Sequence, residues 1–308
     1  MNTSLKGLGL ALLSHVLAAL IPSLLKPLII AAGPIGGGCI MYLYSLLLMT
    51  IFFGGPKAQV THLTTALNNV VARSKLVVIA VLLNAASAIV FFLGLNYAKN
   101  PAVFGAVSKL DEALPFLLSG WLLHERVPKL SFVGALIAFA GGALIVTLGD
   151  LDLATSLGAG FFIIISAAAL VVSKKVLSAG LVSPMGLLVV RQLTVLYLTT
   201  ILFFAMAHPE EGNGFFQLFI SWRSLCVGGV LTGLFYCRFR ALKMIPLWQY
   251  STLGALQPIL MVAAASLMTA AGLADSQPIP QGMWLAVCLV ALGEFTSFFW
   301  ARTQKGGT

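Results

Sequence analysis

The chain has 308 residues, of which 59% are hydrophobic and 9% are charged. A soluble domain carries about 25% charged residues, so this composition excludes a water-soluble fold and indicates a membrane protein. The formal net charge of +9 could suggest a nucleic-acid partner, but the basic residues follow the membrane topology described next, and we expect no nucleic-acid binding.

Ten apolar segments approach or exceed the roughly 20 residues that a helix needs to cross a bilayer. They cover residues 7–30, 37–54, 76–98, 101–123, 130–148, 156–178, 184–206, 224–242, 246–272 and 280–301. The longest connections between them, 55–75 and 207–223, are too short to form a soluble domain. The sequence therefore predicts an all-α integral membrane protein with ten transmembrane helices.

The basic residues are distributed unevenly over the two sides of these segments. With the N-terminus inside, thirteen of the 18 Lys and Arg residues lie on the inner side and three lie outside, while Lys109 and Arg191 lie within segments. Cytoplasmic loops carry the excess of Lys and Arg in membrane proteins. We therefore predict that both termini are cytoplasmic and that most of the net charge is an orientation signal.

The fourth and ninth segments resemble each other. Placing Asn100-Pro101 over Ile245-Pro246 brings them into register, and Asp111 then matches Gln257. Internal repeats often decide the architecture of a membrane transporter.

A second correspondence extends this repeat to the whole chain. Gly33-Pro34 follows the first segment as Ser183-Pro184 follows the sixth, which divides the chain into halves of 1–150 and 151–308. Each half holds five predicted helices, and because five is odd, the second copy must be inverted relative to the first. Inverted repeats place a substrate site near mid-depth between the halves.

Three charged residues lie close together in the fourth segment: Lys109, Asp111 and Glu112. A rise of 1.5 Å per residue from Pro101 places them about 12 to 17 Å deep, where a charge is costly and indicates function. Lys109 can pair with Glu112 three residues later, whereas Asp111 needs another basic partner. We expect Lys109 to contact an anionic substrate, and Asp111 or Glu112 to couple protons or to hold Lys109. The alternative is a salt-bridge cluster that only stabilises the fold.

Small and polar residues form a stripe along the same segment. Gly105, Ser108, Glu112, Pro115 and Ser119 recur at spacings of three and four, which places them on one helix face. This face is predicted to border a water-filled cavity, and Ser108 is a candidate for substrate binding.

Further polar and aromatic side chains in other segments are candidates for the same site. They are His15, Tyr42, Tyr97, Arg191, Tyr236, Tyr250 and Gln257. His15 could carry a proton or could be a hydrogen-bonded packing residue. Arg191 and Glu294 lie at a similar depth, so a pair between them is possible.

Three lysines, Lys26, Lys174 and Lys175, lie near the ends of segments. Long cationic side chains at such positions can extend to the membrane surface. We interpret them mainly as interfacial residues.

Several motifs are absent. The sequence has no Walker A motif, G-x-G-x-x-G, H-E-x-x-H or G-x-S-x-G, which argues against nucleotide chemistry and against zinc or serine hydrolases. Its four cysteines lie in apolar stretches without paired spacing. We expect no cofactor, no metal and no enzymatic activity.

Two blocks, 91–146 and 234–265, resemble the drug/metabolite transporter superfamily, in the branch built from two EamA-type five-helix repeats. That family usually shows a Leu-Glu-Pro element followed by a Gly-Glu-Arg turn. Here the corresponding residues are Leu110-Asp111-Glu112 and His124-Glu125-Arg126, with Leu256-Gln257-Pro258 in the second copy.

The resemblance implies a secondary active transporter that works by alternating access. Its substrate would be a small polar, anionic or zwitterionic metabolite such as an amino acid or organic acid, moved across a bacterial cytoplasmic (inner) membrane, with protons as a further partner. Whether the protein is a monomer or a homodimer is open. The alternative function is a membrane-embedded lipid-handling protein or enzyme that uses the cluster from Lys109 to Glu112.

Overall fold

The computed structural model describes residues 3–73, 75–127, 129–148, 152–206, 209–254, 256–270 and 281–303. Within these ranges every regular element is a helix. The elements are α1 (Thr3–Phe52), α2 (Gly55–Arg73), α3 (Lys75–Tyr97), α4 (Pro101–Ser108), η1 (Lys109–Glu112), α5 (Ala113–Leu122), α6 (Lys129–Leu148), α7 (Leu153–Ser178), α8 (Pro184–Met206), α9 (Pro209–Leu218), α10 (Trp222–Met244), α11 (Leu247–Gly254), α12 (Gln257–Ala270) and α13 (Gln281–Thr303).

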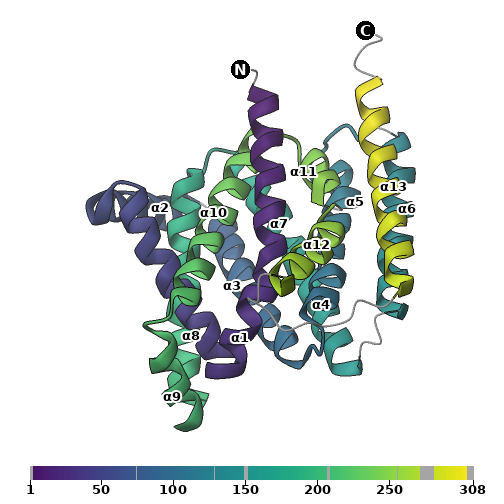
Figure 1. Cartoon of the computed structure of the whole chain (residues 1–308). Coiled ribbons are helices and arrows are strands. Elements are labelled where there is room, and N and C mark those ends of the chain that lie inside the picture. The colour runs from purple at the N-terminus through teal and green to yellow at the C-terminus, as the bar shows by residue number, and fades with distance from the viewer. Residues whose placement is uncertain are drawn as a thin grey trace.

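The long helix α1 consists of two arms that meet at Gly33. Gly33 has φ 71° and ψ 168°, a left-handed conformation that glycine adopts without steric cost. Pro34 follows and has no N–H with which to continue the hydrogen-bond ladder. After descending from the N-terminus, the chain turns back towards α2 (Figure 1). The two arms correspond to the first two predicted segments.

Two other predicted segments are interrupted, so the prediction of a single regular helix in each was wrong. The segment 101–123 is divided into α4 and α5 by η1, a 3₁₀ turn that contains Asp111 and Glu112. The segment 246–272 is divided into α11 and α12, which meet at an angle of 40°. The two breaks are in contact, because a Cβ added to Gly254 at the end of α11 would lie 2.7 Å from Cγ of Glu112. The charged cluster therefore lies where two broken helices touch.

Five helices among the described residues are long and apolar enough to cross a membrane, namely α1, α3, α7, α8 and α10. The bent pair of α11 and α12 becomes a sixth if it is taken as one span. Length and composition thus agree with an all-α membrane protein.

The helices pack into one bundle, with the start of α1 and the end of α13 at the same end (Figure 1). The buried hydrophobic core runs through α1, α3, α7, α8 and α10. Close packing of α1 on α10 depends on Gly228, where a Cβ would lie 2.8 Å from the backbone nitrogen of Ser45. The two longest predicted connections contain helices of their own, α2 and α9, which lie at the periphery.

Candidate functional site

A cavity of about 80 Å³ lies in the middle of the bundle. Its walls come from α1, α3, α7, α8, α10 and α12, so both halves of the chain contribute. Two arginines, Arg191 and Arg238, line it, and no Asp or Glu is found among its described lining residues. The remaining polar lining residues are Tyr42, Asn84, Ser87, Ser166 and Ser173.

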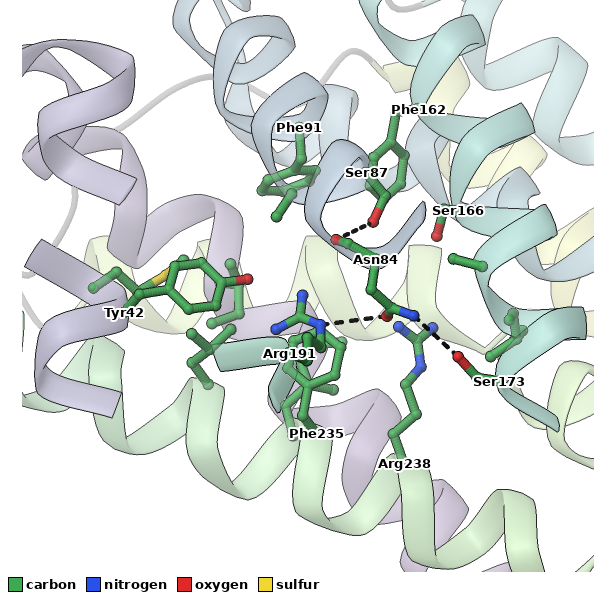
Figure 2. A pocket seen from close by; sticks show the side chains of 18 of the residues that line it. Tyr42, Asn84, Ser87, Phe91, Phe162, Ser166, Ser173, Arg191, Phe235 and Arg238 are labelled. Carbon is green, nitrogen blue, oxygen red and sulfur yellow. Dashed lines mark hydrogen bonds between the residues drawn. The ribbon is translucent and has the colours of Figure 1, made fainter. Parts of the chain in front are cut away.

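Arg191 on α8 is 3% exposed. Its Nε donates to Oδ1 of Asn84 at 3.3 Å, and its Nη1 donates to Oε1 of Gln192 at 3.0 Å. The guanidinium carbon lies 3.4 Å from the centre of the Phe235 ring and 5.3 Å from that of Tyr42. Figure 2 shows the guanidinium above Phe235, with the Tyr42 hydroxyl pointing towards it. In the part of the chain that the structure describes, no carboxylate lies within 4.0 Å of Arg191.

Arg238 on α10 is held differently, because Glu112 neutralises it. Its Nη2 lies 2.7 Å from Oε1 of Glu112, and that carboxylate is 1% exposed. Its Nε donates to the hydroxyl of Tyr250 at 3.0 Å. The Tyr250 hydroxyl is in turn 3.1 Å from Oγ of Ser14. This network connects η1, α10, α11 and the first arm of α1.

His15 and Gln257 extend the same network. Nε2 of His15 is 3.1 Å from the carbonyl oxygen of Tyr250, and the two rings are in contact, with centroids 4.6 Å apart. Gln257 donates from Nε2 to the carbonyl of His15 at 3.2 Å and is fully buried. Three of the predicted site residues, His15, Tyr250 and Gln257, are thus brought together. Tyr250 contacts Arg238, but none of the three lines the cavity.

The charged cluster in η1 is only partly as predicted. Asp111 is buried and accepts a hydrogen bond from the hydroxyl of Ser166 on α7, and its charge also acts on Arg238. Among the described residues, the ion-pair partner of Glu112 is Arg238 on α10. The side chain of Lys109 lies outside the described residues, so the predicted pair with Glu112 and the anion contact fall outside them too. Ser108 is fully buried but does not line the cavity.

The predicted tyrosines fall into two groups. Tyr42 lines the cavity, whereas Tyr97 is 59% exposed at the end of α3. Tyr236 packs against Phe53 and Arg240 and is not a lining residue. The predicted pair of Arg191 with Glu294 cannot be followed, because the Glu294 side chain lies outside the described residues.

Lys26 closes the junction between α3 and α4. Its Nζ donates to the carbonyls of Leu95 and Asn96, both at 2.8 Å. Across the junction, Oδ1 of Asn100 accepts from the N–H groups of Ala102 and Val103 and so caps the start of α4. The lysine therefore satisfies free carbonyls at a helix end instead of extending to the membrane surface.

Lys174 closes the junction between α10 and α11 in the same way. Its Nζ donates to the carbonyls of Leu242 and Ile245, both at 2.7 Å. Here a carboxylate takes part, since Oε1 of Glu125 lies 4.0 Å from Nζ. Glu125 also accepts hydrogen bonds from the N–H groups of Leu247 and Trp248 at the start of α11. A second cavity of about 440 Å³, lined also by Arg126 and Lys243, adjoins this junction.

Sequence reasoning missed Arg238 as a site residue. The thirteen inner-side residues of the topology count include Arg238, together with Arg240 and Lys243, so Arg238 is interpreted there as an orientation signal. One signal was available: Arg238 lies inside the predicted segment 224–242 and not beyond it. Among the described residues, no group of three His, Cys, Asp or Glu side chains could hold a metal ion.

Comparison with protein-family models finds no match, and comparison with curated proteins finds none either. Comparison with solved structures matches 28 chains. One of them, a protein known from its crystal structure, aligns with a TM-score of 0.60 at 19% sequence identity, over 98% of this chain and 99% of that chain. At this identity the match shows a shared fold along nearly the entire length and nothing more.

Proposed function

We propose that this protein is a secondary transporter of the drug/metabolite transporter type, which moves a small anionic or zwitterionic metabolite by alternating access. The observation that carries the proposal is the central cavity, which is surrounded by helices of both halves and is lined by the buried Arg191 and the largely buried Arg238. A charge at the centre of a membrane protein is costly and usually marks a substrate or ion pathway.

We further propose ten spans: the two arms of α1, then α3, the α4–η1–α5 unit, α6, α7, α8, α10, the α11–α12 pair and α13. Three features support two inverted repeats over 1–150 and 151–308. The fourth and ninth spans are both broken, at 109–112 and between α11 and α12. A lysine closes the helix junction before each broken span. The peripheral helices α2 and α9 also occupy corresponding links.

The pair of Glu112 and Arg238 provides a means of coupling. A proton on Glu112 removes the charge that neutralises Arg238, and Arg238 then becomes available to an anion in the cavity. Binding of a proton and binding of the substrate are thereby linked. Protonation also weakens the contact between η1 and α10, which belong to different halves.

Transport is tested by counterflow of labelled organic acids and amino acids into proteoliposomes that contain the purified full-length chain. We expect uptake that saturates and that responds to an imposed pH gradient. The Glu112→Gln variant should still exchange substrate but lose the response to pH. Absence of counterflow across the whole panel would contradict transport, and an unchanged pH response in Glu112→Gln would contradict the coupling role.

The orientation is tested separately. On the distribution of Lys and Arg, we place both termini in the cytoplasm of a bacterial cell. A reporter fused to the C-terminus should be active only in the cytoplasm, and activity restricted to the periplasm would overturn this topology.

A further inference from the structure

Among the described residues, the ionised side chains that line the cavity are both arginines, and Asp111 and Glu112 act on Arg238 from outside the lining. Glu112 neutralises Arg238 at 2.7 Å, but the hydrogen-bond partners of Arg191 are neutral: the amides of Asn84 and Gln192 and the hydroxyl of Tyr42. Removing an ion from water costs several kcal/mol even in a relaxed protein. Amide contacts and the ring of Phe235 offset only part of this cost, so an anion in the cavity would be bound favourably.

Arg191 also has donors to spare. A guanidinium carries five N–H donors in a planar fork, and the bonds to Asn84, Gln192 and Tyr42 use three of them. Stacking on Phe235 fixes the plane of the group without using an N–H. A planar, pre-oriented fork of this kind matches the two oxygens of a carboxylate.

The side of the cavity opposite the arginines contains two phenylalanine rings. Phe91 and Phe162 lie there, with ring centroids 5.2 Å apart, and Ile21, Met41 and Leu170 also belong to the cavity lining. In Figure 2 these two rings lie on one side of Asn84 and both guanidinium groups lie on the other. A ligand that bridges the two walls needs one charged end and a hydrocarbon body.

These observations also separate anions from zwitterions. The described lining residues include no carboxylate that could pair with an ammonium group, and both ionised lining side chains are cations. A monocarboxylate would neutralise the charge of Arg191, whereas an amino acid would bring a second cation against two arginines. The cavity is small, about 80 Å³, which favours a small ligand.

Resting on the transport function proposed above, we infer that the substrate is a small monocarboxylate with an apolar body and no ammonium group. Arg191 binds its carboxylate, and the wall of Phe91 and Phe162 holds its hydrocarbon part. Arg191 thus takes the anion-binding role in this cavity.

The test measures binding and flux separately on the full chain, in nanodiscs and in proteoliposomes. The probes share one hydrocarbon skeleton: 4-methylpentanoate, leucine and 3-methylbutylamine, with inorganic phosphate as a second anion. We expect 4-methylpentanoate to bind at least tenfold more tightly than leucine, phosphate or the amine. Arg191→Gln should weaken its binding at least tenfold, whereas the control Arg240→Gln, which removes an exposed arginine of α10, should leave it unchanged.

Several results would overturn the inference. They are tighter binding of leucine or phosphate than of 4-methylpentanoate, no binding of 4-methylpentanoate, and undiminished binding by a folded Arg191→Gln variant. If Arg191→Gln does not fold, Arg191→Lys keeps the charge without the fork and should weaken binding by a smaller factor, and equal affinity in that variant would again be contradictory. Binding of the carboxylate without flux would refute transport but not this inference, whereas flux of leucine alone would refute this inference but not transport.

Discussion

The junction between α3 and α4 and the junction between α10 and α11 have the same design but different charge. In each, a lysine from another helix donates to two backbone carbonyls at a helix end. At the α10–α11 junction Glu125 adds a carboxylate that also caps the next helix, whereas at the α3–α4 junction the cap is the neutral Asn100. The two junctions lie at opposite ends of the bundle (Figure 1).

The difference indicates which end is held more firmly in this conformation. Lys174 is 8% exposed and contacts an acid, whereas Lys26 is only half-buried and its hydrogen-bond acceptors are carbonyls. Buried charged contacts cost more to break than partly hydrated ones. We therefore expect the α10–α11 end to resist opening more than the α3–α4 end, a comparison that substitutions can test.

The largest effect should come from Lys174→Met. This substitution leaves two carbonyls and Glu125 without their cation, and the loss of a buried charged partner costs about 2 to 3 kcal/mol. The midpoint of thermal unfolding of the purified protein should fall clearly. Lys175→Met is the matched control, because Lys175 is the next residue and is exposed. Equal unfolding midpoints for the two variants would show that the junction does not depend on Lys174.

A smaller effect is expected for Lys26→Met at the other junction. The side chain keeps part of its hydration, so the loss should be about 1 kcal/mol. Thermal unfolding is again the measurement, with the exposed Lys57 replaced by Met as the control. If Lys26→Met destabilised the protein as much as Lys174→Met, the predicted asymmetry between the two ends would be wrong.

The contribution of Glu125 is isolated by a double-mutant cycle with Lys174. The two charged atoms lie 4.0 Å apart and both side chains retain slight exposure, so their coupling should be about 0.5 to 1 kcal/mol. The unfolding free energies of Glu125→Gln, Lys174→Met and the double variant give this value. A coupling near zero would mean that Glu125 acts only as a cap for α11.

Hydropathy was sufficient to predict helices in the ten apolar segments, but not the breaks within them and not the helices α2 and α9 in the connections. Span length depends on bilayer thickness, so apolar runs located helical segments throughout the chain. The 3₁₀ turn at η1 coincides with Lys109, Asp111 and Glu112, which interrupt the apolar run, but hydropathy does not show that the backbone leaves α-helical geometry there. The sharp turn between the two arms of α1 coincides with Gly33-Pro34. A glycine that can adopt positive φ, followed by a proline, ends a helix locally.

Residues of the candidate site were predictable where a polar side chain lies deep within an apolar segment, as for Arg191, Tyr42 and Glu112. It was not predictable where the partner comes from a distant helix. Arg238 is 126 residues from Glu112 along the chain, and spacing within one segment pointed to Lys109 instead. The same applies to Lys26 and Lys174, whose acceptors are backbone carbonyls 68 to 71 residues away.

The smallest effect concerns Asp152, which caps α7 at the surface and interacts with the charge of Lys99 at the α3–α4 junction. The N–H of Thr155 donates to its carboxylate at 2.7 Å, and this bond, with the charge of Lys99, lowers the pKa of Asp152 below its ordinary value. A lowered pKa means that the ionised form stabilises the folded state at neutral pH and that this contribution is lost as the pH falls below about 4. Asp152→Asn keeps a good cap without the charge, so the variant should unfold at a slightly lower temperature than the wild type at pH 7 and at the same temperature near pH 3. A difference that does not change with pH would mean that the charge contributes nothing, and would leave Glu125 as the acid that sets the two ends apart.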